Sequence, residues 1–94
     1  MRDMTELRAE LDAIDRDMVA LFEKRMLVAR EVAMYKLAHG MQVLDAAREE
    51  TVLASRVSML RDGAFAADVR TLYACIMACS RGEQEKCIRE AENV

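Results

Sequence analysis

Residues 4–39, MTELRAELDAIDRDMVALFEKRMLVAREVAMYKLAH, form a stretch without glycine or proline. Its apolar side chains recur at steps of three and four residues, the spacing of one face of an α-helix. This apolar stripe comprises Leu7, Leu11, Ile14, Met18, Leu21, Val28, Val32 and Tyr35. Asp3 followed by Glu6 is typical of a helix start, and Gly40 of a helix stop. The sequence therefore predicts one helix of roughly 35 residues, about 50 Å long.

A helix of this length is too long for the remaining residues to cover, because a compact 94-residue chain has a radius of gyration of only about 12 Å. The apolar stripe is therefore expected to pack against a second copy of the chain, most simply about a two-fold axis. The predicted fold is all-α, a single domain over residues 1–94. It has three helices per chain, one of them very long, in an intertwined helical homodimer.

The rest of the chain reads as two further helices. Asp45 is a suitable N-cap for a second helix, predicted to run to Leu60 or Arg61. Asp62–Gly63 predicts a turn, and a third helix follows from Ala66 to Glu90. No strand-like alternation of useful length interrupts this pattern.

Composition argues against several classes of partner. The net charge of -3 is unlike that of a general nucleic-acid binder, which shows a strong basic excess. No apolar run approaches the ~18–20 residues of a membrane span, and the N-terminus lacks the apolar segment of a signal peptide. We therefore expect a cytoplasmic protein with no nucleic-acid and no membrane partner.

The cysteines are Cys75, Cys79 and Cys87, an odd number that argues against a disulfide framework. Cys75 and Cys79 lie one helical turn apart and could share a metal ion with His39. Such a zinc site would be poor, so reduced thiols are the favoured interpretation, with no metal expected.

Arg25 interrupts the apolar stripe. A buried arginine costs several kcal/mol of desolvation unless an anion meets it. Either Asp45 or Glu49 supplies that anion, or the site binds an anionic ligand. Lys36 lies about three turns after Arg25 on the same helix face, so the second reading would give the ligand two cations.

Further polar side chains fall on the inward faces of the other two predicted helices. Each alone is more typical of a surface charge, a cap or a side chain bonded to its own backbone. Together with Arg25 and Lys36, they predict a buried pocket for a small polyanion. These further residues are Asp45, Arg48, Glu49, Ser80 and Gln84.

Arg8 cannot join this pocket within its own chain, because on one straight helix it lies about 42 Å from Lys36. If two copies of the long helix pack antiparallel near Leu21, Arg8 of one copy lies opposite position ~34 of the other. Arg8 is therefore predicted to complete the pocket of its partner chain.

The spacing of these residues resembles that of the all-helical chorismate mutases. The resemblance is carried by Leu7-Arg8, Ile14-Asp15, Leu21 with Arg25, Glu31-Val32 with Lys36, Val43-Leu44-Asp45, Arg48-Glu49, and Ser80 with Gln84. It covers nearly the whole chain and is most specific in the N-terminal half. Reaching Ser80 and Gln84 needs a one-residue deletion within residues 62–67 relative to a familiar bacterial member.

The resemblance implies an isomerase that rearranges chorismate to prephenate in phenylalanine and tyrosine biosynthesis. It implies a homodimer and no cofactor. Arg8 from the partner chain and Arg25 would bind the two carboxylates of the substrate. Arg48 and Ser80 would complete these contacts.

The resemblance also implies roles at the reacting atoms. Lys36 and Gln84 would be the catalytic residues, donating hydrogen bonds to the ether oxygen as the C–O bond breaks. Glu49 and the backbone at Asp45 would bind the ring hydroxyl. Because the Gln84 side chain is neutral at every pH, the expected activity does not require acidic conditions.

Two residues depart from the family pattern. Gly82 lies between Ser80 and Gln84, where it lowers helix propensity by about 1 kcal/mol and could loosen that side of the pocket. Arg81 adds a cation beside the site and is expected to face solvent.

Two alternative functions stay open. An isochorismate-pyruvate lyase would share the fold, the dimer and the cationic pocket, although Asp45 and Glu49 in the hydroxyl-binding positions favour the mutase. A non-catalytic helical dimer that binds an aromatic-pathway ligand would be expected to lack Lys36, Arg48 or Gln84, and all three are present.

Overall fold

The computed structural model describes residues 1–93, which fold into helices joined by short connections. These are α1 (Met4–Ala38), α2 (Ala46–Ser58), the short 3-10 helix η1 (Gly63–Phe65) and α3 (Ala66–Glu92). No strand occurs within residues 1–93, so the predicted all-α class with one very long helix is confirmed. The predicted end of the second helix at Leu60 or Arg61 is wrong. α2 ends at Ser58, where the amide of Met59 closes a tight turn on the carbonyls of Arg56 and Val57.

The starts of α1 and α2 follow from local chemistry. The side chain of Asp3 accepts a hydrogen bond from the amide of Glu6 at 2.9 Å, and that of Asp45 from the amide of Arg48 at 3.0 Å. Both side chains are N-caps, which satisfy amides that have no partner inside their helix. α1 ends before Gly40, whose φ of +66° is a conformation that glycine adopts without strain.

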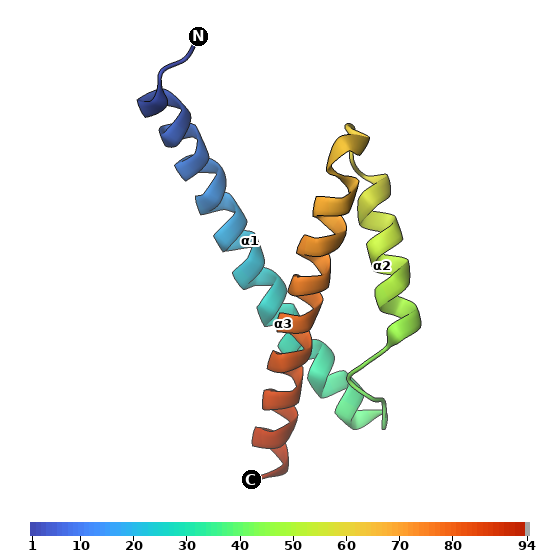
Figure 1. Ribbon diagram of the computed structural model, residues 1–94. Helices are drawn as coiled ribbons and strands as arrows, with labels where there is room; N and C mark the ends of the chain where they lie inside the picture. The colour runs from blue at the N-terminus through green and yellow to red at the C-terminus, as the bar shows by residue number, and fades with distance from the viewer. Residues whose placement is uncertain (94) are drawn as a thin grey trace.

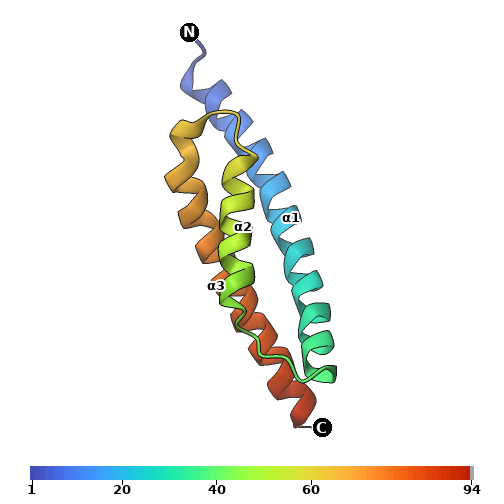
Figure 2. The ribbon, with the colours of Figure 1, turned by 90° about the vertical axis from the view of Figure 1, so that its right-hand side faces the viewer.

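The chain is elongated. α1 packs on α3 and α2 packs on α3, while the N-terminal part of α1 extends away from both of them (Figure 1). The start of α1 and the end of α3 lie at opposite ends of the molecule (Figure 2). The radius of gyration is 16.8 Å and the principal dimensions are 57 × 27 × 14 Å. A compact chain of this size would have a radius of about 12 Å, so much of α1 has no cover from its own chain.

Few apolar side chains are buried, and these are Ala29, Ala33, Val52 and Met77. The apolar stripe of α1 is exposed throughout, with Leu11 at 57% and Leu21 at 65% exposure. The stripe thus needs a cover that this single chain does not supply. A second chain in that place stays a prediction.

The cysteines and the single histidine were considered as metal ligands in the sequence. Cys75 and Cys79 are exposed on α3, and His39 stacks on the ring of Tyr35 at the end of α1. In the described part of the chain, no three His, Cys, Asp or Glu side chains are grouped so that they could hold a metal ion. None of the helices in residues 1–93 has the length and hydrophobicity that crossing a bilayer requires.

Candidate active site

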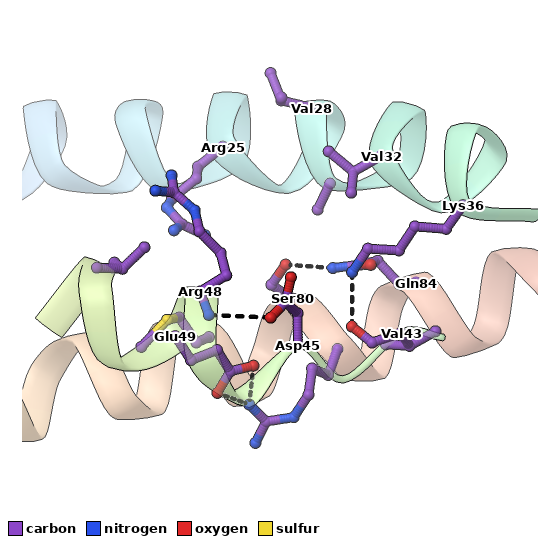
Figure 3. A pocket seen from close by; sticks show the side chains of 14 residues that line it. Arg25, Val28, Val32, Lys36, Val43, Asp45, Arg48, Glu49, Ser80 and Gln84 are labelled. Carbon is purple, nitrogen blue, oxygen red and sulfur yellow. Dashed lines mark hydrogen bonds and ion pairs between the residues drawn. The ribbon is translucent and has the colours of Figure 1, made fainter. Parts of the chain in front are cut away.

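A cavity of about 380 Å³ lies between the three helices. Its volume is within the range of small-molecule sites, about 300–1,000 Å³. The cavity brings together seven of the eight predicted site residues (Figure 3): Arg25, Lys36, Asp45, Arg48, Glu49, Ser80 and Gln84. Its remaining lining is mostly apolar and comprises Val28, Ala29, Val32, Val43, Val52, Met77 and Arg81. The geometry therefore joins residues from all three helices in one concave surface.

The guanidinium groups of Arg25 and Arg48 point into this cavity (Figure 3). Within residues 1–93, neither forms an ion pair or a side-chain hydrogen bond. The carboxylate of Asp45 caps α2 instead. No carboxylate of residues 1–93 therefore pairs with Arg25, which is half-buried, or with Arg48, which is exposed. Both guanidinium groups keep their N–H donors free for an anionic ligand in the cavity.

Lys36 is held at one end of the cavity by the connection between α1 and α2. Its Nζ donates a hydrogen bond to the carbonyl oxygen of Val43 at 2.6 Å. An ammonium group has three N–H donors, so two remain for a ligand. The bond fixes where this charge lies before any ligand arrives.

Ser80 and Gln84 form the α3 wall and are both buried. The Gln84 amide nitrogen donates to the Ser80 hydroxyl oxygen at 2.9 Å, whereas the amide oxygen Oε1 has no partner in the described chain. An unsatisfied buried acceptor costs about 1–3 kcal/mol. Turning the amide over lets Oε1 accept the hydroxyl proton of Ser80 and presents the NH₂ group to the cavity. In either orientation, Gln84 has a polar group available to a ligand.

The prediction that Arg81 faces solvent is wrong. Arg81 lines the cavity instead, and its Nη1 donates to both carboxylate oxygens of Glu49, at 2.5 and 2.6 Å. The sequence did contain a signal, because Arg81 lies four residues after Met77 and three before Gln84, on the face those two residues share. The guanidinium reaches from α3 to α2 because Glu49 offers it a carboxylate there.

A second interhelical ion pair, also missed from the sequence, lies outside the cavity. Nε of Arg30 on α1 donates to Glu83 on α3 at 2.8 Å. This hydrogen bond lowers the pKa of the Glu83 carboxyl and raises that of Arg30. Glu83 directly precedes Gln84, so the pair ties the α3 wall of the cavity to α1.

Arg8 does not line the cavity. It lies in the N-terminal part of α1, where every residue is exposed. Its predicted role in the pocket of a partner chain is compatible with this position and stays a prediction.

Comparison with known proteins agrees with the sequence resemblance. The family model of chorismate mutase type II matches residues 7–85. The T-protein of Haemophilus influenzae is 34% identical over 56 residues, which cover 60% of this chain and 15% of the T-protein. The chain thus spans only a small part of that relative's length. No solved structure gives a significant match.

The match to the family model begins near the start of α1 and ends within α3, so it includes every predicted site residue, from Arg8 to Gln84. The predicted enzyme class, an isomerase, is the class that the name of this family carries. This chain belongs to the chorismate mutase type II family.

Proposed function

We propose that this protein catalyses the intramolecular [3,3] rearrangement of chorismate to prephenate, in phenylalanine and tyrosine biosynthesis and in the cytoplasm. The observation that carries the proposal is a pair of arginines, Arg25 and Arg48, that face one cavity without a carboxylate partner in residues 1–93. The cavity wall holds four cationic side chains and two carboxylates, a net charge of plus two. A small dicarboxylate such as chorismate has the complementary charge.

The reaction needs restraint rather than a nucleophile, because bond breaking and bond making occur within one molecule. The planar guanidinium groups of Arg25 and Arg48 bind carboxylate groups of the substrate. These contacts hold the substrate in a compact, chair-like conformation. Ser80 adds a hydrogen bond to a carboxylate. Restraint of this kind lowers the barrier by removing entropy before the chemical step.

Charge develops on the ether oxygen as the C–O bond breaks. Lys36 and the NH₂ group of Gln84 donate to that oxygen, and such preorganised donors stabilise a transition state more than a ground state. Glu49 and the backbone at Asp45 bind the ring hydroxyl. No metal ion or organic cofactor takes part in this scheme.

The working unit in this proposal is a two-fold homodimer with two shared sites. The exposed apolar stripe of α1 supports it, because a partner α1 packed antiparallel would cover the stripe. The same packing brings Arg8 of one chain to the cavity of the other, where it binds the second substrate carboxylate.

Product analysis after separate incubation with chorismate and with isochorismate tests the activity. Prephenate from chorismate is the expected result, and it should form at neutral pH because Gln84 needs no proton. Pyruvate release from isochorismate with no prephenate from chorismate would identify the lyase instead. If neither compound were converted, the protein would be a non-catalytic binding module.

Mixing two inactive variants tests the shared site. Arg8→Ala and Lys36→Ala chains, allowed to exchange subunits, should recover about one quarter of wild-type activity, because half of the dimers are mixed and each mixed dimer holds one intact site. No recovery after verified exchange would place Arg8 outside the partner's site.

A further inference from the structure

Arg81 differs from the other cavity-lining arginines in having a carboxylate partner. Its Nη1 binds both oxygens of Glu49, and this ion pair is only partly exposed, at 31% for Arg81 and 24% for Glu49. Hydrogen bonds between ionised groups are about twice as strong as neutral ones. The pair joins α3 to α2 across the wall of the cavity.

Other cations line the same cavity as Glu49. Arg48 precedes Glu49 on α2 and Arg25 lies on α1. Among residues 1–93, Glu49 pairs with Arg81 alone, although other cationic side chains line the same cavity.

We infer that Arg81 is a positioning residue that sequesters Glu49, so that Arg25 and Arg48 stay available to the substrate. The inference rests on the proposed dicarboxylate substrate. Without Arg81, Glu49 becomes an internal anion that competes with the substrate carboxylates for the two arginines. The net charge of the wall also falls from plus two to plus one.

This role makes a specific kinetic prediction. A substrate that must first displace Glu49 binds more weakly, but once bound it meets the same reacting groups. Arg81→Met should therefore raise KM for chorismate by about tenfold or more and leave kcat nearly unchanged. Removing the charge of Glu49 as well, in Arg81→Met/Glu49→Gln, should bring KM back to within about threefold of Glu49→Gln alone.

A matched control exists on the same two helices. Arg70 of α3 pairs with Glu50 of α2 at 3.1 Å, and neither residue lines the cavity. Arg70→Met breaks an interhelical ion pair of the same kind and should leave KM unchanged. Circular dichroism and thermal unfolding of all variants show whether the fold is retained.

An unchanged KM in Arg81→Met would overturn the inference, and so would a raised KM that Glu49→Gln fails to restore, because both outcomes mean that Glu49 does not compete with the substrate. These results are separable from the proposed function. If wild-type protein converts chorismate but Arg81→Met behaves like wild type, only the sequestering role fails. If wild-type protein is inactive on chorismate, the proposed function fails first.

Discussion

The two halves of α1 share one helical repeat but have different surroundings. Every residue from position 4 to position 24 is exposed. In the C-terminal half, Ala29 and Ala33 are buried against the rest of the chain, and Arg25 and Lys36 line the cavity. Small side chains let α3 approach that half closely, whereas the N-terminal half carries large apolar side chains that its own chain leaves exposed.

The two halves of the apolar stripe therefore differ in what they contribute to the protein. In the C-terminal half, it borders a site that the single chain already assembles from three helices. In the N-terminal half, exposed apolar area of this extent favours association, at about 25 cal/mol for each Å² removed from water. In the proposed dimer, both halves of the stripe would contribute to each site.

The largest effect is expected from a charge in the N-terminal half. Ile14→Asp places a carboxylate in the apolar stripe of both copies, and an unpaired buried charge costs several kcal/mol in each. We expect the dimer to dissociate and activity to be lost, as measured by analytical ultracentrifugation and a chorismate assay. Ala9→Asp adds the same charge on the opposite face of α1 and should leave the dimer intact. If Ile14→Asp remained a dimer, the N-terminal part of the apolar stripe would not be the surface that holds two chains together.

The next largest effect is expected in the C-terminal half. Lys36→Ala removes a donor to the ether oxygen and the bond to Val43, and loss of one preorganised donor costs about 10²–10³ in kcat. Sedimentation and circular dichroism should still show a helical dimer. Lys24→Ala, an exposed lysine of the same helix, should retain wild-type turnover. Full activity in Lys36→Ala would show that Lys36 is not a catalytic residue.

A smaller, stabilising effect is expected on α3, opposite the C-terminal half of α1. A Cβ added at Gly82 meets no atom within 4 Å, so Gly82→Ala gains helix propensity of about 1 kcal/mol without a clash. The melting temperature should rise by about 4 °C. Ala78→Gly, at an exposed position of the same helix, should lower it by a similar amount. A lower melting temperature for Gly82→Ala would mean that this position is crowded in the assembled protein.

The smallest effect is expected from the exposed ion pair that ties α1 to α3. Arg30 holds the pKa of Glu83 below its ordinary value of 4.5. A carboxyl whose folded pKa is depressed stabilises the fold above its unfolded pKa, and this contribution is lost as pH falls through the folded value. Arg30→Met should therefore melt about 1–2 °C below wild type at pH 7. The difference in melting temperature should shrink as pH falls below 4.5 and disappear once Glu83 is protonated in the folded state. A difference that does not change as pH is lowered would exclude Glu83 as its cause.

Much of the fold and of the site could be predicted because helix geometry converts spacing into direction. Arg25 and Lys36 share a face of α1 by their separation alone, and Asp45 caps α2 through its own local bonds. The end of α2 was placed two or three residues too late, because Met59, Leu60 and Arg61 continue the helical pattern although the chain turns there.

The amino-acid sequence by itself determined the three helices, the capped starts of α1 and α2, and which polar side chains face the same way, because these depend on neighbours within a few residues. Only the tertiary structure decided which charges pair. Glu49 meets Arg81 from 32 positions away, and Arg30 meets Glu83 from 53 positions away. Spacing along one helix does not say which helix lies opposite it, so packing alone assigned Glu49 to Arg81 and left Arg25 facing the cavity.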